Sequence, residues 1–429
     1  MYHRILNFVF KENVLLLSAN IFLIIVISLL SYIAFVQNPK LISQRDSANV
    51  LGLSRGQRKK PSPTPMPSTT PTPIRLSITP SLTPTIATTA PVSNTGGKIL
   101  YVSYDGLDSN SGLSQSSSLK TIQRAVDLAE AGDTIFLADG TYYQDVITKK
   151  HGTSAKPILI RGSSAAVVKG GGRARVIEIN HDFISLDGFT IDGKHKEENS
   201  VSSYRDKLIY ALGKETKDGV NGLKIKNMLI KNAGGECIRL RYFAHDNEIA
   251  SNTILNCGVH DFVFGAGGKN GEGVYIGTAP EQLSDGKNPT SDPDESKNNW
   301  IHHNTFDTQG NECVDIKEAS VGNTVEFNKC TGQKDPNSGG MDSRGNSNTF
   351  KDNEIKGNRG AGVRLGGDTS SEGIQNNVYN NTILDNQSGG VKFMREPQAK
   401  ICGNTMNGNT GGDSVGTYGS RFNPTSPCS

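Results

Sequence analysis

Short stretches of alternating hydrophobic and polar residues, separated by Gly and Asn, fill the chain from about residue 175 onward. Alternation with a period of two is typical of β-strands that bury one side. This part of the chain shows no helical periodicity. The pattern therefore predicts a long series of short strands joined by tight turns, because Gly and Asn are favoured turn residues.

Two strand motifs recur within this series. The first is an apolar pair followed by Asn, as in LKIKNMLIKN (223–232) and NTVEFNKC (323–330). The second has the form of GECIRLR (235–241) and NECVDIK (311–317). The motifs repeat at roughly 22 to 40 residues, a period that indicates a solenoid.

Alignment of the second motif places six side chains at equivalent outward positions, at successive intervals of 36, 40, 27, 22 and 28 residues. The two longest intervals contain insertions, residues 264–271 and 278–299, which we expect to form loops beside the same face. The six outward residues are Arg239, Tyr275, Asp315, Asp342, Arg364 and Lys392.

These features predict an all-β fold, a single-stranded right-handed parallel β-helix over residues 98–429. Residues 99–103 form the first predicted strand. Apolar residues at helical spacing between Leu119 and Ala129, with Gly132 as the stop, predict an amphipathic α-helix that caps the open N-terminal end. A β-propeller would need more regular blades and more aromatic residues than the 7% present.

Residues 14–36 contain no charged side chain and would form a helix of about 34 Å, long enough to cross a bilayer. We predict a transmembrane signal-anchor here, preceded by a short tail at 1–13. A cleaved signal peptide is the alternative, although its apolar region usually spans only about 7 to 15 residues. Residues 37–97 are rich in Pro, Thr and Ser and predict a disordered linker.

All six cysteines lie in the β-helix domain. Two pairs recur at nearly the same spacing, which predicts disulfides within the coils and a third pair at the C-terminal end, with free buried thiols as the open alternative. Disulfides imply an oxidising compartment, so we expect this domain to be anchored outside the cytoplasm, or secreted if the N-terminal segment is cleaved. The pairs are Cys237 with Cys257, Cys313 with Cys330, and Cys402 with Cys428.

Charge gives little sign of nucleic-acid binding, because the net charge is only +3 and the basic residues form no cluster. A local charged patch is nevertheless predicted where two motifs become neighbours. Asp315 and Lys317 project from one strand, as Asp342 and Arg344 do from the next, since side chains at i and i+2 point the same way. This patch is the candidate active site. The alternative is a set of cross-strand ion pairs, each stabilising the fold by at most about 1 kcal/mol.

Several segments resemble the chondroitinase B and alginate lyase family, polysaccharide lyase family six, whose members are parallel β-helices. The resemblance spans roughly residues 98–400. It implies cleavage of a uronate-containing acidic polysaccharide by calcium-assisted β-elimination. The segments are 270–277, 311–318, 341–346 and 360–366, together with 125–142, which is shared by many pectate-lyase-like β-helices.

By this resemblance Lys317 is the catalytic base and Arg344 the acid, while Glu312 and Asn270 correspond to Ca²⁺ ligands. A Lys close to an Arg and a divalent ion would have a lowered pKa, which makes the neutral amine available as a base. Calcium would neutralise the sugar carboxylate, without which the carbanion is unstable.

The sequence departs from the family at two positions, because Gly310 stands where the family has a further Glu and Gly345 where it has a His. The extra carboxylates Asp315 and Asp342 are expected to serve as additional oxygen ligands for Ca²⁺, with pairing to the basic residues as the open alternative. In neighbouring subsites, the residues expected to bind the polymer and its carboxylates are Arg239, Arg241, Tyr275, Arg364 and Lys392.

Two other functions remain open. Asp315 and Asp342 would be the carboxylate pair of a glycoside hydrolase on the same fold. A non-catalytic glycan-binding or adhesive β-helix would use the charges only for docking, and the fold does not separate these functions. The identity of the polysaccharide and the oligomeric state are also open, with a monomer expected.

Overall fold

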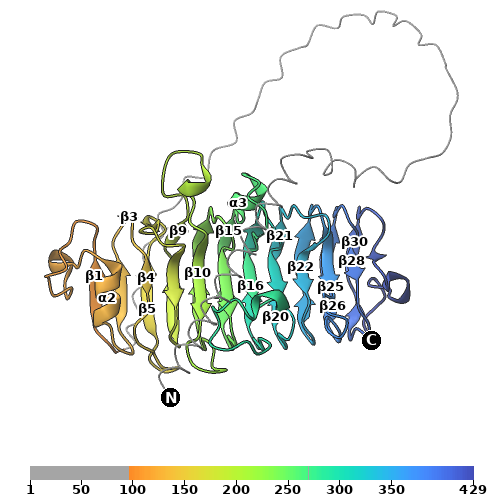
Figure 1. The fold of residues 1–429 in the computed structure, drawn as a ribbon, viewed down its shortest axis with the longest axis horizontal. Helices are drawn as coiled ribbons and strands as arrows, with labels where there is room; N and C mark the ends of the chain where they lie inside the picture. Colours follow the sequence, from red (N-terminus) through yellow and green to blue (C-terminus); the bar gives the residue numbers. More distant parts are fainter. Residues whose placement is uncertain (1–95, 269) are drawn as a thin grey trace, which may run out of the picture. The chain divides into compact units, whose positions relative to one another are not determined.

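Three long parallel β-sheets wind around one core in the computed structural model, which describes residues 96–268 and 270–429 (Figure 1). Each strand pairs in parallel with the strand one coil later, as β19 (Val314–Ile316) does with β22 (Gly339–Ser343). The predicted parallel β-helix is confirmed. The sheets are called A, B and C in the order in which the chain visits them.

Sheet A contains β1 (Ile99–Val102), β2 (Thr134–Leu137), β5 (Ile158–Gly162), β8 (Ile184–Asp187), β11 (Lys224–Lys226), β14 (Glu248–Ala250), β17 (Trp300–His302), β20 (Thr324–Glu326), β23 (Thr349–Lys351), β26 (Asn377–Tyr379) and β29 (Ile401–Cys402). Sheet B contains β3 (Gly140–Tyr142), β6 (Ala166–Val168), β9 (Thr190–Asp192), β12 (Leu229–Lys231), β15 (Thr253–Leu255), β18 (Thr305–Asp307), β21 (Lys329–Thr331), β24 (Glu354–Lys356), β27 (Thr382–Leu384) and β30 (Thr405–Asn407). Sheet C contains β4 (Val146–Ile147), β7 (Arg175–Ile179), β10 (Lys207–Leu212), β13 (Ile238–Arg241), β16 (Val274–Ile276), β19, β22, β25 (Ala361–Leu365), β28 (Val391–Phe393) and β31 (Ser414–Val415).

The core is built by stacking the inward apolar residue of each short strand on its counterpart one coil away. In sheet B, for example, Ile230 pairs with Ile254 and Ile254 with Phe306, and all three are fully buried. Strands of three residues suffice because each coil buries its apolar side chains against its neighbours.

Helix α2 (Ile122–Leu128) packs against β1, β2 and β4 and covers the N-terminal end, as predicted (Figure 1). It is shorter than the apolar spacing indicated, because Ala129 already has extended backbone. Asp133 turns the chain here by accepting hydrogen bonds from the backbone N–H groups of Glu130 and Lys98. The other helices are α3 (Val259–Phe262) and the short 3₁₀ segments η1 (Gln115–Ser117), η2 (Val201–Ser203), η3 (Pro280–Gln282) and η4 (Gly419–Arg421).

The recurring Asn of the first motif forms buried ladders at the corners between sheets. At the corner between sheets A and B, Asn304 Oδ1 accepts bonds from the backbone N–H and the side-chain Nδ2 of Asn252, at 3.0 and 2.9 Å. Each Asn therefore satisfies backbone groups that the turn leaves unpaired. The ladder runs through Asn252, Asn304, Asn328, Asn353, Asn381 and Asn404.

The three predicted disulfides are confirmed, with the expected partners: Cys237–Cys257, Cys313–Cys330 and Cys402–Cys428. The predicted anchor at 14–36 lies outside the described residues, as does the linker up to residue 95. Within residues 96–268 and 270–429, no helix combines the length and apolarity that a membrane span requires.

Candidate active site

The six outward residues of the second motif form one continuous column on sheet C, as predicted. Strand pairing sets Arg239 beside Tyr275, and the register continues through the whole series without a slip. The insertions 264–271 and 278–299 flank β16 along the chain, and residues from both line cavities on this side.

Asp315 lies between the two cations that the sequence assigns to catalysis. Lys317 follows β19 directly, and its Nζ is 2.7 Å from Asp315 Oδ2. Arg344 follows β22, and its Nε is 3.7 Å from Asp315 Oδ1. The structure thus brings together Lys317, Arg344 and Asp315, as the strand alternation predicts.

A cluster of three buried carboxylates adjoins this trio. Glu272, Glu312 and Asp315 each offer an oxygen, and these three oxygens lie within 4.8 Å of one another. Sequence reasoning missed Glu272, although a signal was present. Glu272 and Glu312 stand at the same position of the second motif, as Glu236 does one coil earlier.

The electrostatics of this cluster favour a bound cation. Burial and the charges of Asp315, Asp342 and Glu272 raise the pKa of Glu312 well above its usual value. Burial and neighbouring carboxylates raise the pKa of Glu272 to about 7. Glu312 Oε1 accepts a bond from Ser338, whereas Oε2 accepts none from the described residues. Clustered carboxylates with a free oxygen fit the all-oxygen coordination of Ca²⁺.

In the protein without a metal the pKa of Lys317 is raised, so its lowering beside Arg344 and a divalent ion stays a prediction. Burial favours the neutral amine, but the charge of Asp315, with contributions from Tyr275 and Glu272, outweighs burial and raises the pKa of Lys317. The effect of Arg344, on which the prediction relied, is smaller. The Tyr275 ring lies 4.6 Å from Lys317 Nζ, and burial raises the pKa of this phenol to about 12.

Asp342, one of the expected metal ligands, is not part of the carboxylate cluster, whereas Asn270 borders the same cavity as Glu272 and Glu312. The backbone N–H of Asn270 donates to Asp261 at 2.7 Å, and its side-chain amide lies 3.4 Å from the same carboxylate oxygen. Asp342 Oδ2 is held by Arg364 Nη1 and Ser338 Oγ, both at 3.1 Å. Asp342 is therefore a partner of Arg364 one coil farther along the column.

A cavity of about 210 Å³ opens onto the cluster. Lys317, Arg344 and Tyr275 line this space together with Glu272 and Glu312, so an anionic ligand here would meet both cations beside two carboxylates. Its lining includes Glu272, Tyr275, Gln282, Asn311, Glu312, Lys317, Asp335 and Arg344.

The expected polymer-binding arginines are already paired. Arg239 and Arg241 are each about 2% exposed. Arg239 donates to Glu236 and Gln282, both at 2.7 Å, and Arg241 donates to Asp285 at 2.8 Å. Both line an adjoining cavity of about 310 Å³, but neither is a free cation awaiting an anion.

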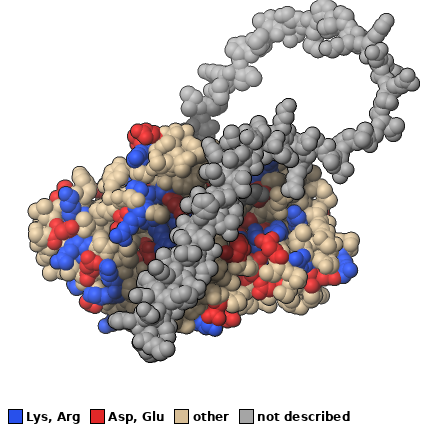
Figure 2. Space-filling view, in the orientation of Figure 1, with Lys and Arg blue, Asp and Glu red and all other residues tan. Residues whose placement is uncertain are grey.

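That adjoining cavity also contains residues that the sequence did not single out, among them Arg175, Lys207 and Tyr210. Arg175 lies over the ring of Tyr210, and Lys207 forms ion pairs with Asp206 and Glu236. Figure 2 shows Lys and Arg interspersed with Asp and Glu on its visible face. Pairing of opposite charges is thus the common state of the basic side chains here.

On the C-terminal side of the site, Arg364 and Lys392 continue the column. Arg364 is 13% exposed and bound to Asp342, and Lys392 Nζ donates to the carbonyl of Asn337 at 3.1 Å. Burial and the nearby Arg364 lower the pKa of Lys392.

Comparison with known proteins finds two family models that match parts of the β-helix. Residues 116–208 match the family model Chondroitinase B. The expected resemblance is confirmed. Residues 294–425 match the model of the right handed beta helix region. The Chondroitinase B match ends before the candidate site, so the roles of the site residues remain predictions.

One solved structure supports the fold. An alginate lyase from Paenibacillus sp. str. FPU-7 is 21% identical with a TM-score of 0.54, over 69% of this chain and 95% of that chain. A mannuronic acid specific polysaccharide family 6 lyase from human gut microbiota is 17% identical with a TM-score of 0.37, over 69% and 80%. At this identity the likeness to the alginate lyase shows the parallel β-helix fold alone.

Among curated proteins, the chain is 33% identical over 117 residues to the uncharacterized protein YwoF of Bacillus subtilis (strain 168). The match covers 25% of this chain and 24% of that protein, so the chain spans about a quarter of the length of this relative.

Proposed function

We propose that the β-helix domain is a lyase that cleaves a uronate-containing acidic polysaccharide by β-elimination. The observation that carries this proposal is that Lys317 and Arg344 line one cavity together with Glu272 and Glu312, while the buried Asp315 behind them pairs with both cations. The Chondroitinase B match and the lyase-like fold support the same chemistry.

In this reaction the proton α to the uronate carboxylate leaves, its electron pair forms the new carbon–carbon double bond, and the glycosidic carbon–oxygen bond breaks. Lys317 would accept the proton and Arg344 would stabilise and protonate the departing oxygen. Lys317 accepts a proton only as a neutral amine. The proposal therefore requires that another cation take up the charge of Asp315.

The residues fit a divalent metal such as Ca²⁺, which Glu272, Glu312 and Asp315 would hold through carboxylate oxygens. When bound, this ion supplies positive charge that offsets part of the negative charge of the cluster and of the sugar carboxylate. Asn270 borders the same cavity and remains a candidate for a further oxygen ligand.

A glycoside hydrolase is the less favoured alternative. Its expected carboxylate pair, Asp315 and Asp342, is fully buried, and each member is bound to a basic side chain. Neither group is placed to protonate a glycosidic oxygen or to activate a water molecule, which a hydrolase requires. A purely glycan-binding role remains the outcome to expect if no product forms.

The location of the protein is part of the proposal. Three disulfides support an oxidising compartment outside the cytoplasm. The charge-free segment 14–36 supports attachment to a membrane.

The test follows the ultraviolet absorbance of the unsaturated uronate while the full chain is incubated with alginate, polygalacturonate, chondroitin sulfate or dermatan sulfate, with Ca²⁺ or with chelator. We expect absorbance to rise with one of these polymers and Lys317→Ala to abolish the rise. Lys329→Ala is the matched control, because Lys329 is an exposed strand lysine on sheet B. New reducing ends without the absorbance would overturn the lyase in favour of a hydrolase.

A further inference from the structure

A larger cavity of about 790 Å³ lies at the N-terminal end of the β-helix, away from sheet C. Its floor is formed by the first three strands of sheet A and its sides by the segments that follow them. The volume falls within the range of roughly 300–1,000 Å³ that is typical of small-molecule sites. None of its lining residues belongs to the candidate active site.

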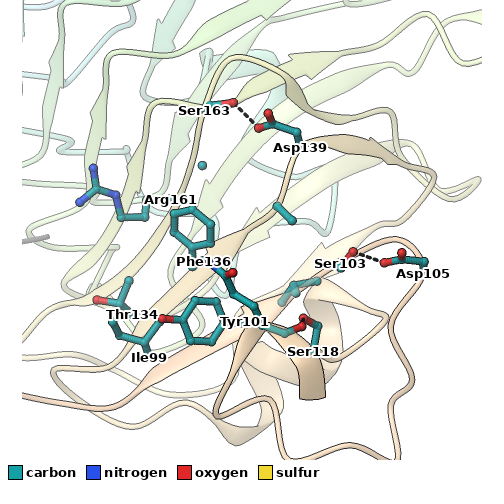
Figure 3. Close-up of a pocket in the computed structure, with 14 residues that line it drawn as sticks. Ile99, Tyr101, Ser103, Asp105, Ser118, Thr134, Phe136, Asp139, Arg161 and Ser163 are labelled. Carbon is teal, nitrogen blue, oxygen red and sulfur yellow. Dashed lines mark hydrogen bonds between the residues drawn. The ribbon is translucent and has the colours of Figure 1, made fainter. Parts of the chain in front are cut away.

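Two aromatic rings on adjacent strands form the apolar part of this cavity (Figure 3). Tyr101 on β1 is paired in register with Phe136 on β2, and Phe136 with Arg161 on β5. The ring centroids of Tyr101 and Phe136 are 5.9 Å apart, and both side chains are half-buried. Part of each ring is therefore open to a ligand.

Polar groups of both kinds surround these rings (Figure 3). Asp105 accepts a hydrogen bond from Ser103, and Asp139 accepts one from Ser163. Each carboxylate keeps further acceptor capacity, because an ionised carboxylate has about four lone-pair sites. The guanidinium of Arg161 supplies donors, and the side chain of Gln115 supplies both donors and acceptors.

Charge distinguishes this cavity from the one on sheet C. Two carboxylates, Asp105 and Asp139, line it against the single guanidinium of Arg161. Arg161 also lies 3.7 Å from Asp187, which offsets part of its charge. An acidic polymer would meet more negative than positive charge here, whereas an uncharged ligand with many hydroxyl groups would not be repelled.

We propose that this cavity binds a neutral oligosaccharide. The faces of neutral pyranose rings present C–H groups that pack on aromatic rings, and their edges present hydroxyl groups that both donate and accept hydrogen bonds. The cavity offers both features in one place, without the cationic surplus that a uronate would require. It is a second carbohydrate site, on a different sheet from the proposed catalytic site and of different ligand charge.

The test is isothermal titration calorimetry of the full chain with cellotriose, xylotriose and mannotriose, and with trigalacturonate as the acidic counterpart. We expect a neutral trisaccharide to bind and Tyr101→Ala to weaken it about tenfold, equivalent to the loss of one stacking contact. Arg161→Gln, at a partly exposed outward position of β5, should weaken the same binding without loss of fold. Thermal unfolding of both variants checks that they remain folded.

Tyr379→Ala is the matched control. Tyr379 occupies the same outward column of sheet A as Tyr101 and Phe136, but it lies in β26 and outside the cavity. The sole Trp of the chain, Trp300, also lies outside, so its fluorescence should not change on binding. Quenching of Trp300 would instead locate the sugar on the middle of sheet A and overturn the proposal.

Three other results would also overturn it: no binding of any neutral trisaccharide, equal effects of Tyr101→Ala and Tyr379→Ala, or preference for trigalacturonate. Deletion of residues 61–91 tests a rival occupant from the chain itself. If this deletion raises the affinity for the trisaccharide, the Pro-rich segment competes for the cavity and is its native ligand. An unchanged affinity supports the oligosaccharide. Because the readout is binding, failure of the proposed lyase activity would leave this result unaffected.

Discussion

Replacing Asp342 by Asn tests whether this buried carboxylate serves Arg364 or a metal ion. Asp342 is fully buried, and its Oδ2 is 3.1 Å from Arg364 Nη1. Asn keeps the size of the side chain and can still accept the bond from Ser338, but the negative charge is lost. Removing one partner of a buried ion pair costs about 3–5 kcal/mol. Because Arg364 remains 13% exposed and partly hydrated, we expect the free energy of unfolding to fall by the lower end of this range, about 3 kcal/mol.

The assay is urea unfolding at neutral pH in the presence of chelator, followed by circular dichroism. Glu354→Gln is the control, since Glu354 pairs with Lys329 at 4.0 Å and both side chains are about half exposed or more. An exposed pair of this kind contributes less than about 1 kcal/mol. If Asp342→Asn cost no more than this control, Arg364 would be hydrated and the reasoning refuted. A large loss of Ca²⁺ affinity in the same variant would make Asp342 a ligand.

Three further outcomes are expected. Glu312→Gln should abolish the rise in melting temperature that Ca²⁺ produces in the wild type, because ligands stabilise only the state that binds them. Asn304→Ala should cost about 2–4 kcal/mol in urea unfolding, because two donors of Asn252 lose their acceptor. Glu236→Gln should destabilise the protein at pH 7 but much less near pH 2. Burial opposes its ionisation, yet Lys207 and Arg239 lower the pKa of Glu236 to about 2, so its stabilisation is complete above pH 4.5 and is lost as pH falls toward 2. A loss that persisted in acid would contradict this assignment.

The register of sheet C was readable from sequence because it depends on local pattern alone. A strand side chain alternates with a period of two, so aligning one motif across coils aligns every outward residue. The same alignment predicts that Asp315 and Lys317 project together and that Arg344 lies close to both. Disulfide partners were equally local, since Cys237 and Cys257 lie within one coil.

Properties that depend on non-local neighbours were not readable. The pKa of Lys317 depends on whether Asp315 or Arg344 approaches it more closely, and side-chain rotamers decide this. The family resemblance does not predict Glu272, because it assigns the ligand of segment 270–277 to Asn270. The position of Glu272 in the motif, shared with Glu312, was the available signal.

The insertion 278–299 shows why an outward charge is not always an available one. Gln282, which it contributes, accepts a bond from Arg239, and Asp285 pairs with Arg241. The long interval predicts a loop beside the face, but its polar residues do not reveal which cations they neutralise.

Arg344 differs from these covered arginines in a way that favours it as the first contact for an anionic polymer. Its Nη1 donates to Asp368 at 2.9 Å, and the Asp368 side chain is 67% exposed. Because Asp368 is largely exposed and is hydrated once displaced, a carboxylate of the proposed uronate substrate can replace it without leaving a buried charge unpaired. Asp315, fully buried on the other side of Arg344, keeps the guanidinium in place during the exchange. Arg239 would have to give up its bond to buried Glu236 to do the same, and that bond is far costlier to break.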